Sequence, residues 1–152
     1  MISFLEWIMT GKFHGLSLGA TLQEVKAVLG EPETYSITRR PDDPFISKYG
    51  RLQITFVEGL AENLYVNVRG YGQDPDFAAD WPLAPFSRGE VESLLLDREL
   101  LWFEDHRPVT EEADLVLTSG VSAMFHEGQL FRWNMGTWEQ KRVKLFQQFF
   151  GL

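Results

Sequence analysis

The side chains that could carry out acid–base or metal chemistry are few and scattered in this chain of 152 residues. Its three histidines, His14, His106 and His126, never stand at the His-x-x-x-His spacing that places two ligands on one helix face. The absence of cysteine excludes thiolate metal sites, cysteine nucleophiles and disulfides. We therefore expect the histidines to lie on the surface, and we expect no metal site and no cofactor.

Motifs for nucleophilic catalysis or phosphate binding are also missing. The chain has no Gly-x-Ser-x-Gly elbow, and no Gly-Lys-Ser/Thr follows its glycine pairs. Glu6, Glu24 and Glu90 stand three residues after Ser3, Thr21 and Ser87, which is the spacing of helix capping boxes. These glutamates have local structural roles, so we expect no catalytic residues and a protein that is not an enzyme.

One constellation remains, in residues 97–114. It holds seven acidic residues against Arg98 and Arg107, with Trp102 and Phe103 among them. Acidic residues around aromatic rings are typical of a surface that binds a basic partner, whereas a solvated loop beside core rings gives the same pattern. A third reading brings Glu104, His106 and Asp114 together from nearby strands. The predicted interface residues are Trp102, Glu104, Asp105, Glu111 and Glu112.

The distribution of charge limits the classes of partner. Residues 1–72 carry seven Lys or Arg and eight Asp or Glu, whereas residues 73–152 carry seven and fourteen. A net charge of −8 disfavours nucleic acid, because phosphate binding needs a positive face. The start of the chain lacks a basic leader and a cleavage site, and no apolar run is long enough to span a membrane. We expect a cytoplasmic protein that binds another protein, a basic one, and neither nucleic acid nor membrane.

The elements that must position these residues occur in two similar series. Residues 21–59 run from a capped helix start to Glu58-Gly59, and residues 87–128 run in the same way to Glu127-Gly128. The offset is 66 residues at Glu24 and Glu90, and 69 at the two turns. Alternating Leu52, Ile54 and Phe56 predict a strand with one buried face. Four strands are expected after each helix, at residues 34–39, 45–49, 51–57 and 63–68, and at 100–104, 114–118, 121–126 and 129–135.

The predicted fold class is therefore α+β, with two similar helix-plus-antiparallel-sheet units in tandem and helices packed on one side of the sheet. We expect a single compact domain, 1–152, built of pseudo-repeats at about 12–70 and 84–135 with a C-terminal helix at 137–150. Thr137 and Gln140 predict a capping box at the start of that helix. The helix carries more aromatic residues than a narrow stripe needs, so it either docks deeply or mediates a homodimer.

The segment 15–32 reads Gly-Leu-Ser-Leu-Gly-Ala-Thr-Leu-Gln-Glu-Val-Lys-Ala-Val-Leu-Gly-Glu-Pro. It resembles the helix opening of the BamE/SmpA and β-lactamase-inhibitor-protein-like group, in which helices lie on a small antiparallel sheet and the inhibitors carry two such units. The lipidation cysteine and the disulfides of that group are absent, and the second series has no Leu-Gly-x-Pro helix end. The resemblance implies a scaffold that binds proteins, and no site residues. The chain also has a general likeness to bacterial immunity-type proteins.

Three functions follow from these patterns. The first is a non-catalytic protein-binding module, an immunity-type inhibitor of a basic toxin or enzyme. The second is a small enzyme or ligand-binding protein with a pocket between the two units, which convergent buried carboxylates would favour. The third is a structural protein that self-associates through a solvent-facing patch of Phe146, Phe149 and Phe150.

Overall fold

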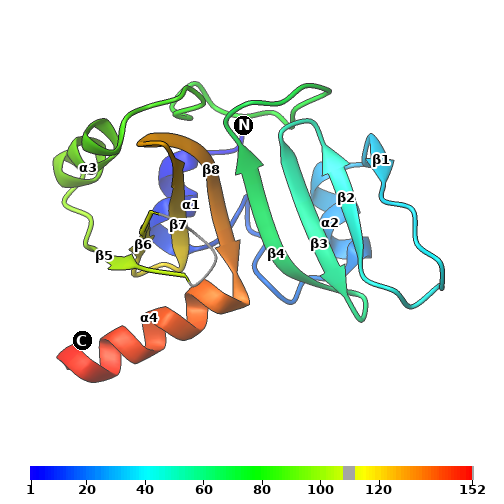
Figure 1. Cartoon of the computed structure of the whole chain (residues 1–152). Helices are drawn as coiled ribbons and strands as arrows, with labels where there is room; N and C mark the ends of the chain where they lie inside the picture. Colours follow the sequence, from blue (N-terminus) through cyan, green and yellow to red (C-terminus); the bar gives the residue numbers. More distant parts are fainter. Residues whose placement is uncertain (108–111, 152) are drawn as a thin grey trace.

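The computed structural model describes residues 1–107 and 112–151, which form four helices and one eight-stranded antiparallel sheet (Figure 1). The fold is therefore α+β, as predicted. The elements are, in chain order, α1 (Phe4–Thr10), α2 (Leu22–Leu29), β1 (Thr34–Tyr35), β2 (Phe45–Tyr49), β3 (Leu52–Val57), β4 (Leu60–Asn67), α3 (Arg88–Asp97), β5 (Trp102–Asp105), β6 (Asp114–Leu117), β7 (Val121–His126), β8 (Gln129–Gly136) and α4 (Thr137–Phe150).

The strand order is β1-β2-β3-β4-β8-β7-β6-β5, so the sheet grows outward from a central β4–β8 pair. The strand predicted at residues 34–39 is shorter, because β1 pairs with β2 only at Thr34 and Tyr35. The two hairpin turns fall where the sequence predicts them. Glu58 and Glu127 both adopt a positive φ, 52° and 51°, which fits the tight two-residue turns that glycine completes.

The predicted strand register is confirmed, because the alternating apolar residues face one buried core. Leu52, Ile54 and Phe56 of β3 are buried, as are Val121, Ala123 and Phe125 of β7. Val25, Val91 and Leu95 on the helices are buried as expected, whereas Leu22, Leu29 and Leu94 are only partly buried against the core. A slip of one residue would have exposed these side chains.

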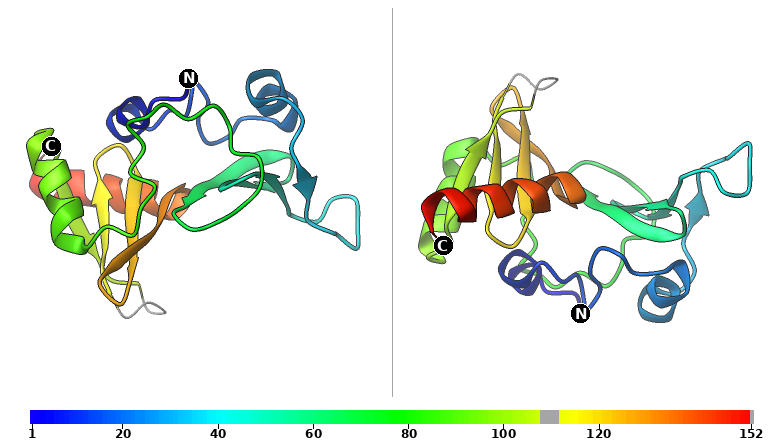
Figure 2. Two further views of the ribbon diagram at one scale, coloured as in Figure 1. Left: turned by 90° about the horizontal axis from the view of Figure 1, so that it is seen from above. Right: turned by 90° about the horizontal axis from the view of Figure 1, so that it is seen from below.

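Three helices cover this core face, and the fourth does not. Side chains of α1, α2 and α3 enter the core cluster. In contrast, Phe146 of α4 stacks on Phe103, with ring centroids 4.5 Å apart. Phe103 points away from the core, because its neighbour Trp102 packs against it. The prediction that all helices lie on one side of the sheet is therefore wrong for α4, which Figure 2 shows apart from α1 and α2.

Local capping explains where the helices begin. Thr21 and Glu24 form the predicted capping box at α2, and the Ser87 side chain accepts a hydrogen bond from the Glu90 backbone at α3. The capping box predicted at Thr137 is wrong, because Thr137 is itself the first helical residue and Gly136 precedes it without a side-chain cap. None of the helices within residues 1–107 and 112–151 is long and apolar enough to cross a membrane.

Truncating the core at Phe56 tests this packing. Phe56 is 0% exposed and stacks on Phe45 at 5.1 Å between ring centroids. Phe56→Ala should lower the free energy of unfolding by roughly 3–5 kcal/mol through lost burial and a residual cavity. Ile37, which is fully exposed, is the control, and Ile37→Ala should change it by less than about 0.5 kcal/mol. Urea unfolding measures both, and equal costs for the two variants would contradict the packing.

Candidate functional site

The residues of the predicted acidic interface do not share one surface. Glu104 is exposed and contacts Arg88, on the side of the sheet that α3 covers. Trp102 lies on that same side and is partly buried against the core. Asp105, the next residue after Glu104, points to the opposite face because side chains alternate along a strand. The expectation that Asp105 is a surface acid is wrong, since it is 1% exposed.

Asp105 instead fixes α4 against the sheet. Its carboxylate accepts hydrogen bonds from Trp138 Nε1 and Arg142 Nε, each at 2.9 Å. Both donors lie in the first half of α4, so this buried acid holds the beginning of the helix. Removing one partner of such a pair leaves a buried charge without compensation, which is strongly destabilising.

The remaining predicted residues have other placements. Glu112 is partly buried, and both of its carboxylate oxygens accept from the Gly128 backbone N–H at 3.0 Å, at the β7–β8 turn. Glu111 lies outside the described residues. His14, His106 and His126 are exposed, as expected. Among residues 1–107 and 112–151, no group of three His, Asp or Glu is placed to hold a metal ion.

A second buried cluster joins β6 to α4. The Arg107 guanidinium lies 3.3 Å from Asp114 Oδ2 and also contacts Glu139, and both acids are almost fully buried. Burial raises the pKa of the Asp114 carboxyl to about 6, and the charge of Arg107 opposes that rise. The third sequence reading, a cluster of Glu104, His106 and Asp114, is not formed, because Asp114 faces α4 and His106 is exposed.

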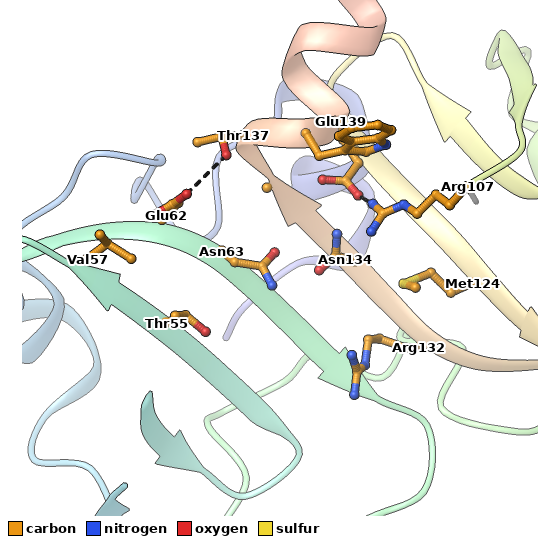
Figure 3. Close-up of a pocket in the computed structure, with 12 residues that line it drawn as sticks. Thr55, Val57, Glu62, Asn63, Arg107, Met124, Arg132, Asn134, Thr137 and Glu139 are labelled. Atoms are coloured by element: carbon orange, nitrogen blue, oxygen red, sulfur yellow. Dashed lines mark hydrogen bonds and ion pairs between the residues drawn. The ribbon is translucent and has the colours of Figure 1, made fainter. Parts of the chain in front are cut away.

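Beside this cluster the face opposite the core is hollowed into an open cavity of about 320 Å³ (Figure 3). Its lining comes from both halves of the sheet and from the first turn of α4. The lining residues are Thr55, Val57, Glu62, Asn63, Arg107, Met124, Arg132, Asn134, Gly136, Thr137, Trp138 and Glu139.

Arg132 lies at one end of the cavity. Its guanidinium carbon is 4.1 Å from the centre of the Tyr65 ring, and its Nε donates to Asn67 Oδ1 at 2.9 Å. Burial lowers the pKa of the guanidinium from its usual value. No carboxylate of the described part of the chain forms an ion pair with Arg132. A cation is therefore partly desolvated here with an aromatic face and an amide as its partners.

Two amide side chains form the middle of the cavity. Asn134 is 4% exposed, and no described residue forms a hydrogen bond with its side-chain amide. Asn63 faces it from β4, and a Cβ built on Gly136 would lie 2.7 Å from Asn63 Oδ1 and 2.8 Å from Glu139 Oε2. Gly136 has an extended φ of −152°, so it serves by leaving space for these two oxygens and not by its backbone freedom.

A separate apolar groove lies at the far end of α4. It has a volume of about 400 Å³ and is lined by Phe103, Glu104, Arg142, Leu145, Phe146, Phe149 and Phe150. Phe149 is 87% exposed, and Leu145 and Phe150 are also exposed. We call Leu145, Phe146, Phe149 and Phe150 with Phe103 the aromatic end of α4.

The sequence reading missed the cavity residues, although a signal for them existed. Leu130, Trp133 and Met135 predict the buried face of β8, so Arg132 and Asn134 alternate onto the opposite face. What the pattern does not contain is the position of α4, which closes that face at one end and brings Glu139 to it.

The chain matches no protein-family model, and it has no significant similarity to a curated protein or to a solved structure. Its candidate functions are therefore argued from the geometry described above. The resemblance of residues 15–32 to the BamE/SmpA and β-lactamase-inhibitor-protein-like group stays a prediction.

The pKa of Asp114 gives a prediction for stability against pH. In the folded chain this carboxyl keeps its proton up to a pH of about 6, whereas its ordinary value is 3.8. The folded state therefore binds more protons than the unfolded state in that window, and this group makes stability fall as the pH rises through it. Asp114→Asn should remove this component.

Urea unfolding of wild type and variant at a series of pH values from about 4 to 7 measures the difference between them. The wild type should lose stability relative to Asp114→Asn as the pH rises. Asp42→Asn is the control, since Asp42 lies in an exposed loop. A difference between wild type and Asp114→Asn that does not change with pH would contradict the raised pKa.

Proposed function

We propose that this chain is a non-catalytic protein-binding module whose docking surface is the aromatic end of α4. The observation that carries the proposal is the exposure of Leu145, Phe149 and Phe150 on consecutive turns of one helix. Single exposed apolar residues are common, but a contiguous patch next to a groove is typical of a protein interface. Aromatic residues in such patches supply much of the binding energy.

The surface is built on a fixed support. Phe146 stacks on Phe103 of β5, with an interplanar angle of 10°, and Phe150 lies 4.7 Å from Phe146 between ring centroids. Val143 one turn earlier is buried, and the Asp105 contacts hold the start of the helix. The exposed rings are therefore presented on a helix whose first turns are anchored, which lowers the entropy cost of binding.

The charges around this surface favour a basic partner. Glu104 lines the groove and is exposed, and the chain as a whole carries a net charge of −8. Opposite charge at the rim of an apolar patch speeds association and selects partners. The occupant that fits is a protein presenting apolar side chains flanked by Lys or Arg, and an immunity-type inhibitor of a basic toxin or enzyme is the specific form of this proposal.

We further propose that the scaffold consists of two tandem copies of one unit. Each series has a helix followed by four strands, and the strand order is mirrored about β4–β8. Register shifts fall at Thr55/Phe56 and at Met124/Phe125, which are 69 residues apart. Thr21 and Ser87 form isolated bridges to Leu60 and Gln129, which continues the same offset. These matches support duplication of the unit beyond common turn residues.

Exchange of the two hairpin segments tests the duplication. Residues 55–60 and 124–129 replace each other in one variant, and in a second variant residues 123–128 replace 55–60. The matched exchange keeps Phe56 and Phe125 on the core face, so the chain should fold cooperatively with a loss of only a few kcal/mol. The shifted exchange reverses the faces and should unfold the chain. Circular dichroism during urea titration measures both, and equal stability of the two would contradict the equivalence.

Site-specific cross-linking tests the binding proposal. A photoreactive phenylalanine analogue at Phe149 is compared with the same analogue at Ile37, which is exposed at the opposite end of the sheet. After irradiation in cells, Phe149 should capture one basic protein that Ile37 does not capture. Glu104→Lys should reduce that capture without changing thermal unfolding, because surface substitutions rarely alter stability by more than about 0.5 kcal/mol.

Other outcomes decide between the alternatives. Capture of a second copy of this chain at Phe149, with a dimer mass in solution that Phe149→Ser converts to a monomer mass, would favour self-association. Identical products at Phe149 and Ile37 would contradict a specific docking surface.

A further inference from the structure

The cavity on the opposite face from the core has features of a ligand site that the protein-binding proposal does not use. Its position between β3, β4, β8, β7 and the start of α4 is far along α4 from the aromatic end. Its lining includes a nearly fully buried side-chain amide, that of Asn134, without a partner among the described residues. Buried polar groups are almost always hydrogen-bonded, so such an amide facing a cavity indicates that a ligand or water satisfies it.

The charges of the lining are arranged as a dipole. Arg107 and Glu139 neutralise each other, which leaves Arg132 and Glu62. Among residues 1–107 and 112–151, Arg132 has no carboxylate partner, and Glu62 accepts only from the Thr137 hydroxyl, at 3.5 Å. Figure 3 shows Arg132 at one end of the cavity, Glu62 at the other, and the amides of Asn63 and Asn134 between them.

The volume limits the size of the ligand. A cavity of about 320 Å³ is at the lower end of small-molecule sites. Since one water occupies roughly 30 Å³ of the liquid, the space suits a molecule of about ten non-hydrogen atoms. The chemistry that matches is a negative group at Arg132, a positive group at Glu62, and polar atoms between them for the two amides.

We propose that this cavity binds a small zwitterion of the amino-acid class, with its carboxylate on Arg132 and its ammonium group on Glu62. The Arg132 guanidinium has its Nε engaged with Asn67, and its two terminal nitrogens can donate to both oxygens of a carboxylate. A carboxylate there compensates the charge that burial penalises. Asn134 and Asn63 donate to, or accept from, the polar atoms of the ligand, which gives specificity to the orientation.

The test is isothermal titration calorimetry of the whole chain with each proteinogenic amino acid as the probe. At least one free amino acid should bind with a Kd below about 10 mM, in the range of weak but specific complexes. Its α-amide and its N-acetyl derivative should each bind at least about tenfold more weakly, because each removes one of the two charges. Acetate and phosphate alone serve as probes for a site that recognises only an anion.

Two variants assign the ends of the ligand. Arg132→Gln should weaken binding of the free amino acid at least about tenfold but leave the weak binding of its α-amide unchanged, and Glu62→Gln should do the same with the N-acetyl derivative. Arg98→Gln and Asp42→Asn, which alter exposed charges elsewhere, are the matched controls and should bind as the wild type does.

Thermal unfolding of every variant separates loss of the site from loss of the fold. The proposal is overturned if no amino acid binds, if the capped derivatives bind as well as the free amino acid, if acetate or phosphate binds as tightly, or if both variants retain wild-type affinity. Because the variants lie outside the aromatic end of α4, failure here leaves the cross-linking at Phe149 unaffected.

Discussion

The antiparallel pairing of β4 with β8 joins the two halves of the sheet and determines which side chains lie on each of its faces. Opposite residues in this pair run from Asn63 with Gly136 to Asn67 with Arg132. Leu64 and Val66 meet Met135 and Trp133 on the core face, so Asn63, Asn134 and Arg132 necessarily alternate to the other. A one-residue slip in this pair would remove both the core contacts and the cavity.

The last residue of this pair also directs α4. Gly136 ends β8 in an extended conformation, and α4 begins at the next residue. The helix therefore starts beside the central strands and runs across the face opposite the core, toward β6 and β5. Without a side-chain cap at its start, its placement depends on tertiary contacts, which Asp105, Asp114 and Arg107 supply.

The sequence predicts the parts of this fold that depend on local or periodic information. Alternation in residues 51–57 establishes the face of β3, and Ser87 with Glu90 marks the start of α3 within one residue. The same reasoning fails for Asp105, because its burial depends on Arg142 and Trp138, which are more than 30 residues away in sequence. A charged residue in an acidic segment looks solvated until the helix that neutralises it is placed, and periodicity does not place it.

The two candidate surfaces lie on the same helix but depend on it in different ways. At its start, Glu139 is buried, Trp138 contacts Asp105, and Thr137 contacts Glu62, so the cavity exists only where α4 meets the sheet. At its end, Phe149 contacts mainly other rings of α4 and is exposed. The end can therefore bind a partner without moving the start, because Asp105 and Val143 hold the turns between them. Coupling between a ligand in the cavity and a partner at the aromatic end would require α4 to shift as a whole, and the buried ion pairs of Arg142 and Arg107 oppose such a shift.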